Sequence, residues 1–225
     1  MIAAAGGLRV VVLISGRGSN LQAILDGVAS GEVPVDIAAV ISNRPHAYGL
    51  ERARRVGVET VVLDHKSFPE RESFDQTLRE RIDSYRPGLI VLAGFMRILS
   101  DDFVEYYRGR MLNIHPALLP KYRGLDTHAR AIAAGEREHG ASVHFVTPEL
   151  DSGPVIVQAR VPVLAGDDID ALAARVLRQE HRIYPLVVRW FAEGRIKLID
   201  GCVFLDDRPL HKPIILEATE RLPSL

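Results

Sequence analysis

The 225-residue sequence has few of the features that mark exported, membrane-bound or broadly nucleic-acid-binding proteins. A lone cysteine, Cys202, excludes a disulfide within the chain. No apolar run approaches the roughly 18 residues of a membrane-spanning helix, and the opening MIAAAGG lacks the charged and apolar regions of a secretory signal. Because 28 basic and 29 acidic residues leave a net charge of -1, no broad positive field is available for nucleic acid. We therefore expect a cytoplasmic protein that binds anions only locally.

The sequence does have the composition of an ordinary globular chain. Its residues are 47% hydrophobic and 25% charged, which is enough apolar material for a full core at this length. No internal repeat, low-complexity tract or Pro/Gly/Ser-rich linker divides it. We expect one domain over residues 1–225, with residues 1–7 forming a frayed leader.

Five short, β-branched apolar runs are typical of buried parallel strands. They lie at residues 8–15, 35–42, 60–64, 88–94 and 111–115. Helical stretches separate the first four, and this alternation predicts an α/β fold with a doubly wound, mostly parallel, Rossmann-like sheet. Towards the C-terminus we expect a helix over 168–192, which Pro185 would kink or divide, and a short β-hairpin around Asp200 and Gly201. Ligands of such a sheet bind beyond the carboxyl ends of the strands.

A glycine loop, GRGSN at residues 16–20, follows the first strand and leads into a helix. Its backbone N–H groups and the helix N-terminus would suit a phosphate. The loop lacks both the Gly-Lys-Ser/Thr of a P-loop and the third glycine of a dinucleotide fingerprint. A tight turn with a Ser or Asn cap on the helix explains the same residues equally well.

The stretch FMRILS, residues 95–100, continues the apolar character of the fourth strand past its expected end. Such a segment can form the wall for a flat apolar ligand. It can equally be core that leads into the next helix, which Ser100 and Asp101 would cap.

Two polar residues stand on one face of the fifth predicted strand. Asn113 and His115 alternate there, and Pro116 ends the strand directly after the imidazole. An amide can donate to a developing oxyanion, and an imidazole can carry a proton near neutral pH. The plainer alternative is a hydrogen-bonded core pair at a strand end.

A carboxylate lies in the turn between two later strands, within SVHFVTPELDSGPV at residues 142–155. If this turn folds over the fifth strand, Asp151 would lie beside His115, whereas turn chemistry alone also accounts for an aspartate there. His144 could line the same place or be a core histidine. The scattered histidines and the single cysteine make a metal site an unattractive interpretation.

The segments SGRGSNLQAI, VLAGFMRILS, LNIHPALLPKYRG and GASVHFVTPELDSGPVIVQA, in that order, resemble the phosphoribosylglycinamide formyltransferase family. The resemblance implies transfer of a formyl group from 10-formyltetrahydrofolate to the amine of 5-phosphoribosylglycinamide, in de novo purine biosynthesis. The reaction would pass through a tetrahedral intermediate without a metal. It also implies a nucleotide-binding half at residues 8–110 and a catalytic and folate-binding half at 111–225.

The resemblance also assigns roles to single residues. Asn113 would hydrogen-bond the formyl oxygen, His115 would be the catalytic acid, and Asp151 would raise the pKa of that imidazole and assist proton transfer. The residues expected to bind the ribonucleotide are Gly18, Ser19 and Asn20 at the phosphate and Glu180 at the ribose. Those expected to bind folate are Arg71, Met96, Arg97, Ile98, Leu99, Asn113, Thr147, Pro148, Glu149, Leu150 and Asp151.

Three positions depart from the family pattern. Leu177 can contribute only packing at a position where the family pattern allows a polar group, and Arg17 and Arg123 add positive charge near the expected phosphate. Two sister enzymes, methionyl-tRNA formyltransferase and formyltetrahydrofolate hydrolase, remain alternatives, although each would need a further domain. A third alternative is a non-catalytic nucleotide- or folate-binding module. We expect small-molecule partners, no nucleic acid or membrane, and a monomer or homodimer.

Overall fold

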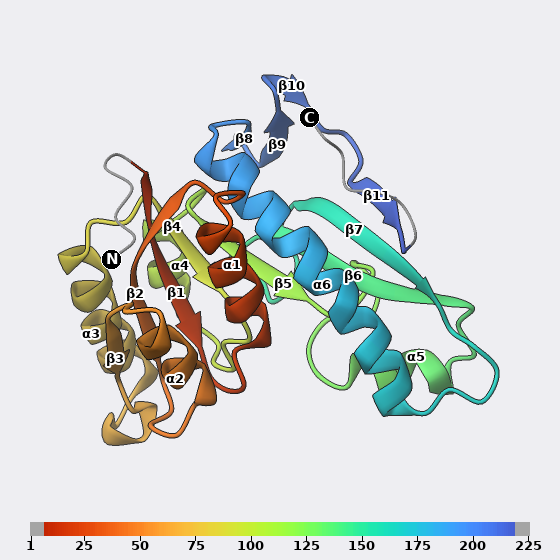
Figure 1. Ribbon diagram of the computed structural model, residues 1–225, viewed down its shortest axis with the longest axis horizontal. Coiled ribbons are helices and arrows are strands. Elements are labelled where there is room, and N and C mark those ends of the chain that lie inside the picture. Colours follow the sequence, from red (N-terminus) through yellow and green to blue (C-terminus); the bar gives the residue numbers. More distant parts are fainter. Residues whose placement is uncertain (1–6, 219–225) are drawn as a thin grey trace. The chain divides into compact units, whose positions relative to one another are not determined.

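The computed structural model describes residues 7–218, so all but the last residue of the expected leader lies outside the described residues. Two compact units make up the chain, Met1–Asn113 and Ile114–Leu225 (Figure 1). None of the helices within the described range is long and apolar enough to cross a membrane.

The first unit is built on parallel strands in the order β3-β2-β1-β4-β5. Their bounds are β1 Leu8–Ile14, β2 Val35–Ser42, β3 Thr60–Val62, β4 Leu89–Leu92 and β5 Met111–His115. All five predicted strands are confirmed, with ends shifted by at most two residues. β5 crosses the boundary between the units, and its first three residues, Met111 to Asn113, pair with β4.

Helices connect the strands of this unit. They are α1 Ser19–Ala29, α2 Tyr48–Arg55, α3 Arg71–Ser84 and α4 Asp101–Tyr106, with a 3-10 turn, η1, at His65–Ser67. Right-handed crossovers in this strand order place α1 and α2 on one face of the sheet and α3 and α4 on the other, and each pair is in contact. The direction of winding reverses between β1 and β4, so the loops after these two strands lie where a doubly wound sheet binds its ligands.

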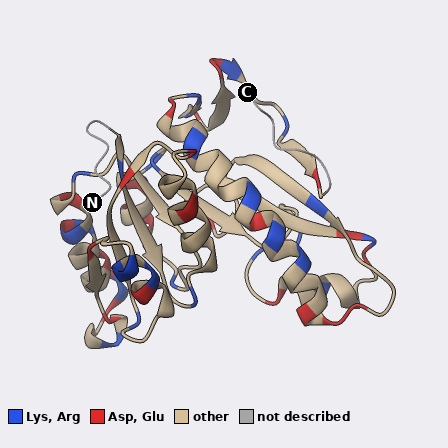
Figure 2. Ribbon diagram, in the orientation of Figure 1, with Lys and Arg blue, Asp and Glu red and all other residues tan. Residues whose placement is uncertain are grey.

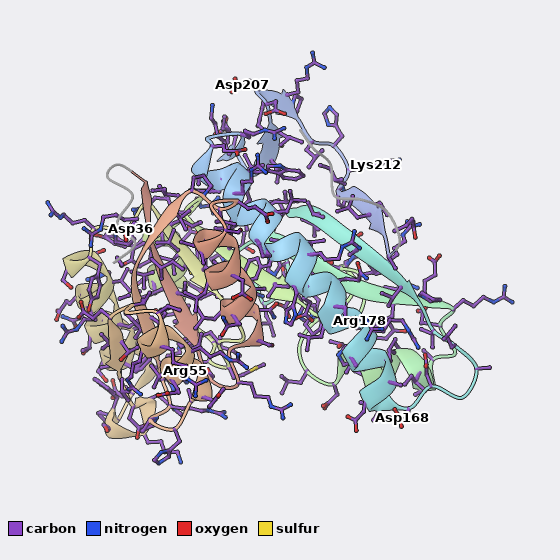
Figure 3. The ribbon with its side chains drawn as sticks, viewed as in Figure 1. Asp36, Arg55, Asp168, Arg178, Asp207 and Lys212 are labelled. Carbon is purple, nitrogen blue, oxygen red and sulfur yellow. The ribbon has the colours of Figure 1, made fainter. Side chains whose placement is uncertain are left out.

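The second unit contains an antiparallel pair, β6 Glu138–Phe145 and β7 Val155–Pro162, together with α5 Thr127–Ala133. A long helix, α6 Ile169–Ala192, packs on both strands and begins at Asp168, whose carboxylate accepts the Ala171 N–H at 2.7 Å (Figure 3). β11, Ile214–Glu217, adds to β7 in parallel. The sequence did not indicate this strand, because four residues after Pro213 carry no alternating pattern. The predicted mostly parallel α/β class is confirmed.

The helix and the hairpin predicted at the C-terminus of this unit are both present. Pro185 lies inside α6 and does not divide it, since the helix spans 24 residues, with buried neighbours on either side of the proline. Trp190, on the last turns of α6, is 1% exposed and lies under the Arg195 guanidinium at 5.6 Å. The hairpin is confirmed: β8 Ile196–Ile199 pairs with β9 Cys202–Leu205 across two left-handed turn residues, and β10 Arg208–Pro209 adds a third strand.

Charged residues of both signs are interspersed over the helices and loops of each unit (Figure 2). This pattern matches the near-zero net charge of the chain. Any strong field at a ligand must therefore come from a few local groups.

Candidate active site

His115 is held from both ring nitrogens at the end of β5. Its Nε2 lies 2.8 Å from the Tyr122 carbonyl oxygen, and its Nδ1 lies 3.3 Å from Asp151 Oδ2. Because a carbonyl oxygen can only accept, Nε2 carries a hydrogen, and Nδ1 is the nitrogen that gains or loses the proton. The imidazole is only 5% exposed. A charged His115 would therefore have its counter-ion in place.

Asp151 is fixed by its backbone as well as by its partners. It adopts a left-handed φ of 50°, and its Oδ2 also accepts the Gly124 N–H at 2.9 Å. The turn closes tightly behind it, since a Cβ on Gly153 would lie 1.7 Å from the Phe145 carbonyl oxygen. The turn that the sequence indicated here is confirmed, and it brings the carboxylate to His115 within the second unit.

His144 fits both alternatives that the sequence left open: it is a core histidine, and it also lies beside Asp151. It is a buried histidine bonded to backbone, with Nδ1 2.8 Å from the Phe145 carbonyl oxygen. It also lines the carboxylate, with Nε2 3.8 Å from Asp151 Oδ1. Burial lowers the pKa of His144 to about 4, so the ring is neutral at physiological pH and leaves the Asp151 charge for His115.

The segment from Pro116 to Asp126, here called the Tyr122 loop, presents the carbonyl that fixes His115. Tyr122 has a left-handed φ of 56°, and its hydroxyl donates to Glu136 Oε1 at 2.8 Å. Its ring lies edge-on to His139 and beneath the Arg130 guanidinium. These contacts hold the side chain, and the backbone conformation then directs the carbonyl to the imidazole.

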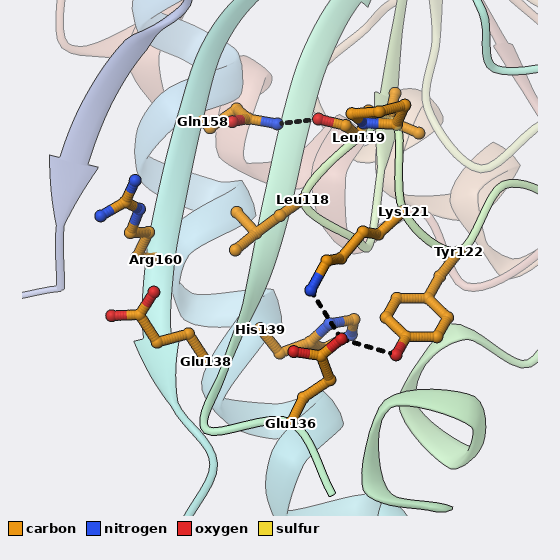
Figure 4. Close-up of a pocket in the computed structure, with 10 residues that line it drawn as sticks. Leu118, Leu119, Lys121, Tyr122, Glu136, Glu138, His139, Gln158 and Arg160 are labelled. Carbon is orange, nitrogen blue, oxygen red and sulfur yellow. Dashed lines mark hydrogen bonds and ion pairs between the residues drawn. The ribbon is translucent and has the colours of Figure 1, made fainter. Parts of the chain in front are cut away.

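Polar side chains of β6 and β7 hold the start of the same loop. Ser142 Oγ donates to the Ala117 carbonyl oxygen at 2.7 Å and accepts the Leu119 N–H at 3.1 Å, and Gln158 Nε2 donates to the Leu119 carbonyl oxygen at 2.8 Å. Figure 4 shows Gln158 reaching Leu119, and Lys121 and Tyr122 meeting at Glu136, around a cavity of about 280 Å³. The loop is thus fastened at both ends by hydrogen bonds.

Two further histidines, His128 on α5 and His139 on β6, pair with each other next to Tyr122. His139 Nε2 and His128 Nδ1 are 3.1 Å apart, and burial lowers the pKa of both rings, that of His139 to about 4. A hydrogen bond between two neutral imidazoles requires one donor and one acceptor nitrogen, so protonation of the accepting nitrogen removes it. Tyr122 and Ser142 were not among the site residues expected from the sequence, and His128 and His139 were left without a role. The functional atom of Tyr122 is a backbone oxygen, for which no side-chain signal exists.

In the first unit, Gly18, Ser19 and Asn20 form the start of α1. Gly18 precedes the helix with a left-handed φ of 70°, and no side chain caps the helix, so the simple Ser or Asn cap is the wrong interpretation. The first helical bond runs from Gln22 N–H to the Gly18 carbonyl oxygen. As at the start of any helix, the amides before Gln22 make no bond within the helix itself, and a helix N-terminus of this kind suits a phosphate.

α2 supports this glycine loop. Gly49 N–H donates to the Gly16 carbonyl oxygen at 3.0 Å, and Arg52 Nε donates to the Arg17 carbonyl oxygen at 2.9 Å. A Cβ on Gly18 would lie 2.6 Å from Gly49 Cα. α1 and α2 therefore approach each other closely at the loop, where Gly18 contacts Gly49. The Arg17 side chain is exposed.

The segment 95–100 is a partly buried loop between β4 and α4. Met96 and Ile98 are 59% and 58% exposed, whereas Leu99 is buried. The Arg97 guanidinium lies 4.5 Å over the Phe74 ring. Ser100 caps α4, as predicted, by accepting the Phe103 N–H at 3.4 Å.

The remaining predicted contacts are divided between the units. Asn113 is half-buried in β5, two residues before His115, and Arg71 is exposed at the start of α3 beside Glu72 at 3.5 Å. Glu180 is 7% exposed on α6. Arg123 pairs with Glu149 at 2.8 Å, so its added charge is largely offset. Among residues 7–218, no three His, Cys, Asp or Glu side chains gather as a metal site.

Residues 8–188 match the family model described as formyl transferase. The chain belongs to the formyl transferase family. Phosphoribosylglycinamide formyltransferase from Escherichia coli strain K12 is 56% identical over 203 residues, which cover 90% of this chain and 96% of that enzyme. The human trifunctional purine biosynthetic protein adenosine-3 is 42% identical over 190 residues, or 84% of this chain and 19% of that protein.

Solved structures of this formyl transferase family have the same fold. Phosphoribosylglycinamide formyltransferase from Coxiella burnetii superposes with a TM-score of 0.90 at 53% identity, covering 93% of this chain and 99% of that one. Glycinamide ribonucleotide transformylase 1 from Symbiobacterium toebii gives 0.86 at 46% identity, covering 91% and 97%. The resemblance that the sequence motifs indicated is confirmed, and the non-catalytic binding module is no longer needed as an alternative.

Proposed function

We propose that this enzyme transfers the formyl group of 10-formyltetrahydrofolate to the amine of 5-phosphoribosylglycinamide, giving N-formylglycinamide ribonucleotide and tetrahydrofolate. The observation that carries the proposal is the buried His115, held between the Tyr122 carbonyl and the Asp151 carboxylate. It stands two residues after Asn113 on one strand of a formyl transferase. Within residues 7–218, no Ser or Cys side chain bonds the His115 imidazole, which favours direct attack by the substrate amine.

The catalytic trio, Asn113, His115 and Asp151, divides this chemistry among its three side chains. The amine attacks the formyl carbon, and the Asn113 amide donates a hydrogen bond to the oxyanion that develops. A protonated His115 stabilises the same charge, with Asp151 as its counter-ion. As the adduct collapses, the bond between the formyl carbon and N10 of the folate breaks. The amine nitrogen gives up a proton and N10 gains one, so the side chains return to their starting state.

The surrounding residues bind the two substrates. Gly18, Ser19 and Asn20 receive the phosphate at the start of α1, and Glu180 binds the ribose hydroxyls. Folate contacts residues 96–99, where Met96 and Ile98 are exposed and apolar, and the turn at residues 147–151, with Arg71 near its glutamate tail. Leu177 contributes packing only.

The same proposal covers location and assembly. A purine-biosynthesis enzyme with balanced charge works in the cytoplasm on small molecules, without nucleic acid or membrane. It acts as a monomer or homodimer, with 10-formyltetrahydrofolate as co-substrate and no metal. Gel filtration with light scattering measures the assembly state directly.

The deciding experiment follows tetrahydrofolate release from 10-formyltetrahydrofolate, with and without 5-phosphoribosylglycinamide. We expect release only when the ribonucleotide is present, with formylated ribonucleotide formed in equal amount. Release without it would identify a hydrolase. Folded protein that releases nothing in either case would refute the proposal.

A further inference from the structure

Ser15 makes three hydrogen bonds at the carboxyl end of β1, in the first unit. Its N–H donates to the Gly94 carbonyl oxygen at 3.1 Å. Its hydroxyl donates to Asn43 Oδ1 at 2.6 Å and accepts the Met96 N–H at 2.7 Å. An amide oxygen only accepts and a backbone N–H only donates, so both roles of the hydroxyl are fixed. Ser15 is 3% exposed.

Asn43 anchors this hydroxyl from the end of the neighbouring strand β2. It is 1% exposed, and its own carbonyl oxygen lies 2.8 Å from His65 Nδ1, which acts as the donor. The connected groups therefore come from the ends of β1, β2 and β4 and from η1. A buried network with defined directions has little freedom to rearrange one bond without the others.

The two loops that Ser15 joins were assigned to different substrates. Ser15 directly precedes residues 16–20, the proposed phosphate loop, and its hydroxyl holds the backbone of Met96, which begins the proposed folate loop. We propose that Ser15 is a positioning residue whose hydroxyl couples the binding of the ribonucleotide to the binding of folate. The inference rests on the proposed function, because that function assigns the two loops.

The physical basis of this coupling is shared ordering. A ligand that fixes one loop also fixes Ser15, and through it the amide at the start of the other loop. The second ligand then meets a segment that already has less freedom to lose, so it binds more tightly. Ser15 itself need contact neither ligand, which distinguishes it from the catalytic trio.

The test measures the dissociation constant of tetrahydrofolate by calorimetry, with and without saturating 5-phosphoribosylglycinamide. These two ligands cannot react, since tetrahydrofolate carries no formyl group. We expect the ribonucleotide to tighten binding in the parent enzyme by roughly 5-fold or more, the lower end of ordinary coupling between two sites. In Ser15→Ala the ratio should approach one, while each ligand alone binds within about threefold of the parent, a margin well below one tenfold step in affinity.

Ser42→Ala is the matched control. Ser42 is a fully buried serine on β2 whose hydroxyl bonds only locally, to the Arg44 carbonyl oxygen at 2.9 Å and the Arg44 N–H at 3.1 Å. Its loss should leave the coupling ratio unchanged. Ser15→Cys is the alternative if Ser15→Ala lowers stability too far for calorimetry. A thiol is similar in shape to the hydroxyl but donates and accepts hydrogen bonds only weakly, so this variant should also reduce the ratio.

Two results would overturn the inference alone: a parent that transfers formyl groups yet binds the two ligands independently, or a Ser15→Ala variant that keeps the parental ratio. A parent that transfers no formyl group would instead refute the proposed function. Equal loss of coupling in Ser42→Ala would reduce Ser15 to a general packing role.

Discussion

At the scale of single residues, His115 is defined by what holds it rather than by its own exposure. We predict that His115→Ala lowers kcat by roughly 10²-fold or more, because proton transfer and charge stabilisation are lost together. Binding of each substrate should change little, whereas the urea midpoint should fall, because the buried Asp151 carboxylate loses its partner. Steady-state kinetics checks this, with the exposed His46→Ala as control. Turnover near the parental value would remove the imidazole from the reaction.

Asp151 can be tested without disturbing its turn. In Asp151→Asn an amide oxygen can still accept the Gly124 N–H, and asparagine tolerates the left-handed φ. The negative charge beside His115 is lost, so we expect kcat to fall by roughly 10-fold to 10²-fold with stability retained. Asp126→Asn is the control, since that exposed aspartate has a similar φ of 57° and caps no amide. Equal kinetics for the two variants would assign Asp151 to turn geometry alone.

The polar side chains of the candidate site could be picked out from the sequence, whereas the groups that hold them in position could not. Asn113, His115 and Asp151 stand out because polar residues at strand ends and in a turn are unusual within apolar runs. The Tyr122 carbonyl could not be identified, since every residue has one. Ser15 and Asn43 carried a weaker signal: Ser15 is the last residue of the first predicted strand and Asn43 directly follows the second, at the edge where ligands bind.

At the scale of elements, the contact between α1 and α2 depends on two glycines. Gly18→Ala places a Cβ 2.6 Å from Gly49 Cα at a residue with φ of 70°. We expect KM for the ribonucleotide to rise by roughly 10-fold or more, because the loop must move to relieve backbone strain. Gly16→Ala is a close control, since a Cβ there meets nothing within 4 Å. A rise in KM of equal size in both variants would contradict the steric explanation.

The His128–His139 pair makes the packing of α5 against β6 sensitive to pH. The folded-state pKa of His139 is lowered to about 4 from an ordinary 6.5, so the unfolded chain binds more protons between these values. Neutral His139 therefore contributes to the free energy of unfolding above about pH 6.5. This contribution, on the order of 3 kcal/mol in total, is lost as the pH falls towards 4. Urea unfolding at several pH values should show a weaker slope in His139→Gln than in the parent. The exposed His46→Gln should keep the parental slope, and an unchanged slope in His139→Gln would contradict the assignment.

Elements with strong periodicity or length were predictable, and those defined by their neighbours were not. The apolar strands and the hairpin turn at Asp200 and Gly201 follow from local pattern. β11 forms because β7 offers an unpaired edge, which a local pattern does not record. Pro185 does not divide α6, because the buried face of the helix stabilises it across the proline.

At the scale of the whole molecule, β11 closes one edge of the second unit. Leu216 is its buried residue, at 5% exposure. We predict that Leu216→Asp lowers the free energy of unfolding by about 2–4 kcal/mol and exposes β7 to pairing with other chains. Urea unfolding and light scattering on warming check both effects. The exposed Lys212→Asp, whose position is labelled in Figure 3, should change neither, and a stable, non-aggregating Leu216→Asp would show that β11 is dispensable.

The burial of Trp190 has a practical consequence for spectroscopy. It is the only tryptophan of the chain and lies in the second unit, so its emission reports that unit and is blind to the first. Circular dichroism reports both units. If the two signals change at the same urea concentration, the halves unfold as one cooperative body, and if they separate, the first unit melts on its own. The exposed Cys202, also unique, accepts a dye whose energy transfer from Trp190 would follow the hairpin during the same titration.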